Sequence, residues 1–169
     1  MTPRPEAAAA HLPHVVATGF TTALLGDERT LREFVIGDQA ARTLRDQGVN
    51  AVLYLINDSY DPLNERQLRV GVEKDERRMA QFAAFCGRPI AEIPDPYDCH
   101  SSYSDHFLEG LLDRLYGLDI HPLVLDAHPA YQRGHYAPFV RMTLGRYREI
   151  QEAITASCHN YTPRQLYCV

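Results

Sequence analysis

Three runs of apolar residues without polar alternation stand out along the chain, and each predicts a short buried strand. They lie at 14–18, 51–56 and 122–125. The central run reads Ala-Val-Leu-Tyr-Leu-Ile, which is typical of a strand covered on both faces, as in a parallel sheet. A polar turn follows each of the first two runs, through Thr21 and Thr22 after the first and from Asn57 to Asp61 after the second, so both strands are expected to end there.

Between these runs, apolar residues recur at helical spacing. The recurrence from Leu31 to Leu44 predicts a helix that ends near Gly48, because glycine is favoured just after a helix. Three further helices are expected, at 67–86, 104–116 and 135–157. Ser104 is the expected cap of the second of these. The order of strands and helices favours a three-layer α/β fold with a mostly parallel sheet.

The length and composition fit one globular domain. A chain of 169 residues with 45% hydrophobic and 23% charged residues can bury a real core. Residues 1–13 predict a flexible arm and 14–169 a single domain, with an irregular tail at 160–169. The net charge is −5 and no run of basic residues is present, so the sequence does not predict a binding surface for long nucleic acids. No apolar run is long enough to predict a membrane span.

The cysteines give information about the cellular compartment and about possible metal or thiol chemistry. They form no Cys-x-x-Cys pair and no secretory segment precedes them, which predicts reduced thiols in a cytoplasmic protein. Cys99 and His100 are adjacent, so we expect their side chains to point in different directions, and only His106 follows nearby. No metal site is therefore expected. A Cys–His nucleophilic pair would need a setting that favours the thiolate.

Polar turns follow the first two predicted strands, and in open sheets ligands bind beyond the carboxyl ends of the strands. In the first turn, Gly19 would let a ligand approach the backbone, and the hydroxyl of Thr21 offers hydrogen bonds. In the second, Asp58 and Asp61 could pair with an ammonium group. Both segments can equally be structural turns, since their residue types are those of turns.

The order of several segments resembles that of class I lysyl-tRNA synthetases. The segments are the Thr-Gly-Phe-Thr turn at 18–21, Leu-Arg-Glu at 31–33, the acidic element at 57–63, Gly-Arg-Pro-Ile at 87–90 and the proline loop at 94–107. The proline loop, with its Cys-His pair, is the most specific. The resemblance covers roughly 14–168 and implies the first half of that family's HUP-type nucleotide-binding fold.

The resemblance also implies an amino-acid pocket. Its residues would be Thr18, Gly19, Thr21, Asp58, Asp61, Cys99, His100 and Tyr103. In this pocket Asp58 and Asp61 would face the ammonium group of the substrate, and the loop residues would close over it. The implied small-molecule partner is an amino acid or an aminoacyl nucleotide, and the implied cofactor is ATP or an adenylate.

The chain departs from the family at the HIGH-type motif, where it reads Gly-Asp-Glu-Arg-Thr at 26–30. Asp27 replaces the histidine and Arg29 the tight-turn glycine, so the nucleotide-binding set Asp27, Arg29 and Thr30 is degenerate. An aspartate would repel phosphate, and Arg29 would partly compensate. A KMSKS-type loop and an anticodon-binding domain have no counterpart, so self-contained aminoacylation and tRNA binding are not expected.

Three hypotheses remain open. The first is a truncated synthetase-like protein that binds an amino acid or aminoacyl nucleotide in a specialised biosynthetic or amino-acid-modifying pathway rather than in translation. The second is a non-catalytic regulatory or interaction module. The third is a new enzyme in which Cys99 or His100 is catalytic. Half of a sheet would expose an edge, so a homodimer or a partner chain is expected to cover it.

Overall fold

The computed structural model describes residues 12–157. The chain divides into two compact units, Met1–Pro129 and Ala130–Val169, which are described separately below. The expected tail at 160–169 and nearly all of the expected arm at 1–13 lie outside the described residues. The single domain over 14–169 stays a prediction.

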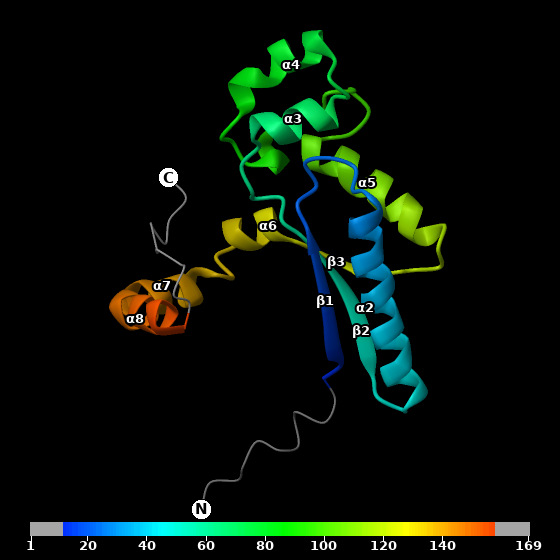
Figure 1. Ribbon diagram of the computed structural model, residues 1–169, viewed down its shortest axis with the longest axis vertical. Coiled ribbons are helices and arrows are strands. Elements are labelled where there is room, and N and C mark those ends of the chain that lie inside the picture. The colour runs from blue at the N-terminus through cyan, green and yellow to red at the C-terminus, as the bar shows by residue number, and fades with distance from the viewer. Residues whose placement is uncertain (1–11, 158–169) are drawn as a thin grey trace, which may run out of the picture. The chain divides into compact units, whose positions relative to one another are not determined.

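The first unit is built on a parallel sheet of three strands (Figure 1). They are β1 (His14–Phe20), β2 (Ala51–Asn57) and β3 (Leu123–Asp126), in the order β1-β2-β3. The register pairs Phe20 with Asn57 and Asn57 with Asp126, so all three strands end at one edge of the sheet. The three apolar runs thus form the strands that they predict, and the parallel α/β fold class is confirmed.

Two helices pack with β2 into the first hydrophobic core. They are α2 (Glu28–Asp46), which runs alongside the strands in Figure 1, and α5 (Tyr103–Tyr116). The buried residues of this core are Phe34, Ala41, Leu53, Leu55, Leu111, Leu115 and Ile120. Burial of one such large side chain stabilises a fold by about 1.5–3 kcal/mol. A Cβ on Gly37 would lie 2.8 Å from Cγ2 of Thr18, so glycine lets α2 approach β1 closely.

The cap of α5 differs from the prediction by two residues. Ser102, not Ser104, is the N-cap, and its hydroxyl accepts the backbone N–H of Asp105 at 3.1 Å. Both serines satisfy the sequence rule for a cap, which names the residue type and not the exact position. The side chain of Ser104 is buried instead.

The predicted continuous helix at 67–86 is wrong. The segment forms α3 (Glu65–Gly71), α4 (Glu76–Phe82) and the short 3₁₀ turn η1 (Ala83–Phe85). Glu73 and Lys74 adopt positive φ values of 55° and 63°, and the carboxylate of Asp75 caps α4 by accepting two backbone N–H groups. Residues 73–78 are all charged, so the apolar spacing is interrupted at the break, and the prediction had joined the apolar residues on its two sides into one helix.

A second core lies between α3, α4, the turn η2 (Ile90–Glu92) and the start of α5. Its buried residues include Leu63, Leu68, Val72, Phe82, Ile90, Ile93, Tyr103 and Phe107. This core holds the proline loop against the rest of the unit, since Ile93 just before the loop and Tyr103 within it are both buried. The backbone N–H of Tyr103 also donates to the carbonyl of Ile93 at 2.8 Å.

The edge strands carry exposed apolar side chains. Val15 on β1 is 57% exposed and Leu123 on β3 is 51% exposed. Within residues 12–157 both strands pair on one side only, since β2 lies between them. The predicted homodimer or partner chain that would cover such an edge stays a prediction.

The second unit is helical. It contains the end of α6 (Ala127–Gln132), together with α7 (Ala137–Gly145) and α8 (Tyr147–Ser157). The predicted single helix at 135–157 is wrong, because α7 ends at Gly145 and the next residue, Arg146, has φ and ψ of −115° and 22°. None of the helices in the described part of the chain is long and apolar enough to cross a membrane.

Candidate functional site

The turns after β1 and β2 lie side by side at the carboxyl edge of the sheet. The backbone N–H of Asp58 donates to the carbonyl of Phe20 at 3.0 Å. The hydroxyl of Thr21 donates to Oδ2 of Asp61 at 2.6 Å. A Cβ on Gly19 would lie 3.7 Å from Oδ2 of Asp58. The structure thus brings together four of the predicted pocket residues, two from each turn.

The electrostatics of this edge favour a cationic ligand. Burial, and next the negative charge of Asp61, raise the pKa of Asp58 above its ordinary value. Within residues 12–157 no arginine, lysine or histidine forms an ion pair with Asp58 or Asp61. An ammonium group placed here would offset the repulsion between the carboxylates.

A network of buried hydrogen bonds supports the carboxyl edge of the sheet. No sequence pattern predicted this network. The hydroxyl of Thr22 donates to Oδ1 of Asn57 at 2.7 Å, and Nδ2 of Asn57 donates to the hydroxyl of Ser104 at 3.1 Å. The hydroxyl of Ser59 donates to Asp126 at the end of β3. These bonds tie the ends of the three strands to α5, and a fully satisfied network of this kind holds the turns rigid.

Two predicted pocket residues belong to the interior instead. Thr18 is buried, and its hydroxyl donates to the carbonyl of Tyr54 at 2.9 Å. Tyr103 is fully buried in the second core, and its hydroxyl donates to the carbonyl of Ala23 at 3.1 Å. Both side chains therefore stabilise the fold, and neither is open to a ligand at the edge of the sheet.

The predicted nucleotide-binding residues lie at the start of α2. Asp27 caps this helix, and its Oδ1 accepts the backbone N–H groups of Arg29 at 2.9 Å and Thr30 at 3.3 Å. Oδ2 of Asp27 also pairs with Nη2 of Arg29 at 2.7 Å, and this hydrogen bond is the main cause of the lowered pKa of Asp27. A phosphate at this position would compete with Asp27 for the same N–H groups.

An open groove of about 880 Å³ runs beside these residues. Besides Asp27, Arg29 and Thr30, it is lined by Arg32 and Arg66 and by apolar side chains such as Leu25. Because Asp27 and Glu33 also line the groove, three arginines stand against two carboxylates, and the groove has a small excess of positive charge. The groove can therefore accept an anionic group, but the helix start itself is already satisfied by its own aspartate.

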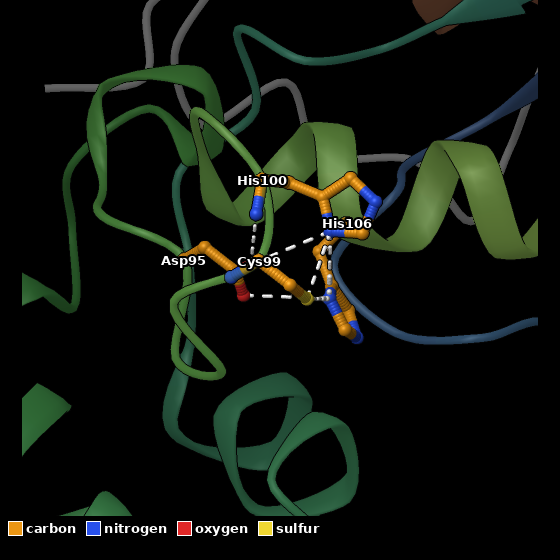
Figure 2. A group of neighbouring side chains, drawn as sticks. All are labelled: Asp95, Cys99, His100 and His106. Atoms are coloured by element: carbon orange, nitrogen blue, oxygen red, sulfur yellow. Dashed lines mark hydrogen bonds and ion pairs between the residues drawn. The ribbon is translucent and has the colours of Figure 1, made fainter.

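A second group of side chains converges in the proline loop (Figure 2). Sγ of Cys99 lies 3.1 Å from Nδ1 of His100 and 3.3 Å from Nδ1 of His106. The expectation that Cys99 and His100 point in different directions is therefore wrong. Asp98 adopts a positive φ of 57°, so the backbone turns sharply just before Cys99.

Asp95 organises this loop, and the sequence patterns did not single it out. Its carboxylate accepts the backbone N–H groups of Tyr97, Cys99 and His100 at 2.9, 2.8 and 2.7 Å. Burial alone would raise the pKa of Asp95, but these hydrogen bonds outweigh burial and lower it to about 2. The side chain is thus a buried carboxylate. Its ion-pair partners among the described residues are His100 and His106.

The setting of Cys99 bears on the hypothesis of a cysteine nucleophile. Burial, and next the hydrogen bond and charge of Asp95, raise the pKa of the Cys99 thiol. A nucleophilic cysteine needs the opposite shift, because the thiolate is the reactive form. The loop therefore does not activate Cys99 as a free thiol.

The eight predicted pocket residues thus form separate groups. Within residues 12–157 no hydrogen bond or ion pair joins Cys99 or His100 to Asp58 or Asp61. Four of the residues gather at the edge of the sheet, two in the proline loop and two in the interior. The edge offers charge for an ammonium group, whereas the loop offers sulfur, nitrogen and oxygen atoms that could hold a metal ion.

Comparisons with known proteins agree with the parallel α/β fold. A family model described as tRNA synthetases class I (K) matches residues 4–169. The lysine–tRNA ligase of Archaeoglobus fulgidus is 36% identical over 141 residues, which is 83% of this chain and 27% of that protein. The enzyme of the same name from Methanocaldococcus jannaschii is 31% identical over 150 residues, 89% of this chain and 27% of that protein. The chain therefore spans about a quarter of the length of these curated relatives.

Proposed function

Because this chain belongs to the class I lysyl-tRNA synthetase family, we propose that it binds an amino acid at the carboxyl ends of β1 and β2. The ligand is a free amino acid or the aminoacyl part of an aminoacyl nucleotide. Lysine is the first amino acid to test, since the relatives are named lysine–tRNA ligases. The chain corresponds to one part of those relatives, so their complete reaction is not assigned to it.

One observation carries this proposal: Asp58 and Asp61 lie together without a basic partner in the described part of the chain. A pair of carboxylates at a strand edge gains most from a ligand that brings a positive charge. Thr21 holds Asp61 in place through its 2.6 Å hydrogen bond. The exposed backbone at Gly19 leaves room for the rest of the ligand beside Asp58.

For the nucleotide we propose only weak binding. We place an adenylate or ATP along the groove beside Asp27, Arg29 and Thr30, where Arg32 and Arg66 supply positive charge. The carboxylate of Asp27 already holds the N–H groups at the start of α2. ATP alone is therefore expected to bind weakly, and a lysyl-adenylate analogue is expected to bind mainly through its aminoacyl group.

The proposed setting is a specialised biosynthetic or amino-acid-modifying pathway, with a homodimer or a partner chain supplying further surface. The exposed Val15 and Leu123 on the edge strands support the need for such a partner. Size-exclusion chromatography with light scattering tests the homodimer. If the chain is a monomer at all concentrations, the homodimer is ruled out, and a separate partner chain is the remaining way to cover the edge strands.

The test of ligand binding is calorimetry with the full chain. Lysine is compared with norleucine, which lacks the side-chain ammonium group, and with cadaverine, which lacks the carboxylate. Binding of lysine that weakens in Asp58→Asn and Asp61→Asn supports the proposal. Asp113→Asn is the matched control, because Asp113 is exposed on α5 and away from this edge. No binding by the folded wild-type chain would overturn the proposal and favour the interaction module.

A further inference from the structure

We propose that two copies of this chain pair through β1, antiparallel and side by side, so that their two three-stranded sheets join into one sheet. The inference rests on the homodimer named in the proposed function and identifies its interface, but it does not depend on lysine binding. The occupant of the β1 edge is thus a second copy of this chain.

The backbone of β1 is hydrogen-bonded to β2 through its even-numbered residues. The N–H of His14 donates to the carbonyl of Asn50 at 2.7 Å, and the carbonyl of Phe20 accepts the N–H of Asp58 at 3.0 Å. In a parallel pair, every second residue of a strand bonds to the same neighbour. The even positions between these two ends therefore also bond to β2.

The odd-numbered residues of β1 present their backbone groups to the open side of the strand. These residues are Val15, Ala17 and Gly19. In the described part of the chain, β1 has β2 as its one neighbour in the sheet, and no loop or turn bonds to the backbone of these three residues. A row of unpaired N–H and C=O groups is a template for pairing with another strand.

β1 lacks the features that normally keep an edge strand from pairing. Its seven residues include no proline, lysine, arginine, aspartate or glutamate, and proline or charge is the usual protection of an edge. Pro13 comes directly before the strand and ends the row of donors there. The opposite edge strand, β3, has four residues and ends in Asp126. Of the two edges, β1 is therefore the one suited to pairing.

The sequence of β1 is complementary to itself in the antiparallel direction. With the two-fold axis at Ala17, two small side chains meet at the centre. Val15 then lies opposite Gly19 of the partner subunit, so a large side chain faces a position without one. Val16 lies opposite Thr18 of the partner subunit, and cross-strand pairs of β-branched residues stabilise sheets. In this register each of the odd-numbered pairs exchanges two hydrogen bonds.

Pairing at β1 also brings the two α2 helices side by side. α2 packs on both β1 and β2, and neighbouring strands lie about 4.8 Å apart. The two helices are then separated by about twice that spacing, roughly 10 Å, which is close to the distance between packed helices. A Cβ on Gly37 would lie 2.8 Å from Cγ2 of Thr18 and 3.8 Å from Cγ1 of Val16. The axis at Ala17 therefore passes near the middle of α2.

α2 carries an apolar stripe on the flank toward the open side of β1. Ile36, Ala40 and Leu44 follow at four-residue spacing and share one side of the helix. The opposite flank carries Asp38 and Arg42, and Arg42 bonds to the turn just before β3. Ile36 is 63% exposed and Ala40 is exposed as well. In an antiparallel pair of helices Ala40 lies at the crossing, where its small side chain permits close approach.

The strand and the helix thus point to the same two-fold axis, with a small residue of each layer at its centre. A strand from an unrelated protein could satisfy the hydrogen bonds of β1. It would not by itself match the stripe on α2. This agreement between two layers is the reason to assign the edge to a second copy.

The pairing bears on the proposed amino-acid site. His14 of the partner subunit lies opposite Phe20, the last residue of β1. The carbonyl of Phe20 accepts the N–H of Asp58, and Thr21 follows it directly. The partner strand therefore holds the strand end from which the site begins. The face of Gly19 toward Asp58 stays open, because strands pair in the plane of the sheet.

The experiment is sedimentation velocity of the full chain without lysine, over a wide range of concentrations. The wild-type chain should change from monomer to dimer as its concentration rises. Ala17→Lys places two positive charges opposite each other at the axis, and Ala40→Glu places two negative charges at the helix crossing. Each variant should raise the dissociation constant of the dimer about tenfold or more, because like charges are brought together.

Matched controls carry the same charges at other exposed positions. Leu123→Lys lies on β3, the other edge strand, where Leu123 is 51% exposed. Gln39→Glu lies next to Ala40 but on another side of α2. Both controls should leave the dissociation constant of the dimer unchanged. Far-ultraviolet circular dichroism checks that all four variants are folded.

Hydrogen exchange measured by nuclear magnetic resonance locates the contact in the wild-type chain, independently of any variant. The amides of Val15, Ala17 and Gly19 should exchange rapidly in dilute samples and at least about tenfold more slowly in the dimer. The amide of Thr18 bonds to β2 and should be protected at both concentrations.

Three outcomes would overturn this interface. The first is a wild-type chain that stays monomeric, and calorimetry with lysine would then still decide the amino-acid site on its own. The second is a dimer that Ala17→Lys and Ala40→Glu leave intact or that Leu123→Lys weakens. The third is protection of the amides of Val15, Ala17 and Gly19 in a monomer, which would show that another segment covers β1.

Discussion

Asp58 and Asp95 are both carboxylates in the first unit, yet their surroundings shift their pKa values in opposite directions. Burial and the neighbouring Asp61 raise the pKa of Asp58. Burial also acts on Asp95, but three backbone N–H groups outweigh it and lower its pKa to about 2. Asp95 is thus satisfied by its own loop, whereas Asp58 gains from a cation that the described residues do not supply.

This difference separates two kinds of acidic residue. A carboxylate that accepts several backbone N–H groups stabilises local structure whether or not a ligand is present. A carboxylate next to another carboxylate is stabilised when a positively charged ligand binds, because the ligand offsets the repulsion between them. The sequence shows an aspartate in a polar turn in both places, and only the surrounding hydrogen bonds distinguish them.

The largest expected effect comes from Asp95→Asn. An amide cannot accept all three N–H groups equally well, and its own NH₂ group opposes one of them. Hydrogen bonds to charged groups contribute about 1.5–3 kcal/mol each, so we expect a loss of roughly 2–4 kcal/mol. At about 2–4 °C per kcal/mol this lowers the Tm by roughly 5–15 °C, as measured by calorimetric melting. An unchanged Tm would show that the N–H contacts are not stabilising.

Asp58→Asn is the counterpart of that variant. It removes the carboxylate repulsion, so the Tm should stay equal or rise slightly. The affinity for lysine should fall about tenfold to hundredfold, because a charge-assisted contact is lost. Calorimetric titration measures the affinity, with Asp113→Asn as the control. A large fall in Tm would instead place Asp58 in the same structural class as Asp95.

The pH dependence of lysine binding sharpens the comparison further. The ligand needs the ionised form of Asp58, and the pKa of this carboxyl in the free chain lies above the ordinary 3.8. The affinity should therefore fall with acid at a higher pH than it would for an ordinary aspartate. Titrations across the acidic range measure this, and Asp58→Asn should flatten the profile. A wild-type profile as flat as that of the variant would contradict the assignment.

The smallest effect is expected for Tyr103→Phe. The hydroxyl of Tyr103 donates to the carbonyl of Ala23 inside the second core. Its loss should cost about 1 kcal/mol of stability, the ordinary contribution of one hydrogen bond. The affinity for lysine should not change, because the side chain is fully buried. If Tyr103→Phe lowered the free energy of lysine binding by more than the free energy of unfolding, Tyr103 would contact the ligand.

Much of the fold could be predicted from local patterns. The three apolar runs form the three strands, and the helix from Leu31 to Leu44 lies within α2. The breaks inside the longer helices were missed, because they depend on single residues. Asp75 caps α4 inside a short charged run, and positive φ values at Glu73 and Lys74 precede it. Periodicity averages over several turns and does not detect such a break.

The candidate site was predictable in part. Asp58 and Asp61 follow a strand, and the rule that ligands bind at the carboxyl edge places them correctly beside Thr21. Thr18 and Tyr103 were assigned to the same pocket, but both are buried. Which face of a strand or helix a residue occupies depends on packing against α2 and the second core, and a short motif does not record that packing.

The sequence by itself determined the parallel α/β fold and the edge of the sheet at which polar turns gather. Strand and helix formation depend on residues close in the chain, so these features can be read locally. Only the tertiary structure decided that Cys99 and His100 meet His106 and Asp95. The three N–H contacts of Asp95 hold the loop in the conformation in which these side chains lie together. That convergence depends on loop geometry and on the packing of α5, which spacing along the chain does not specify.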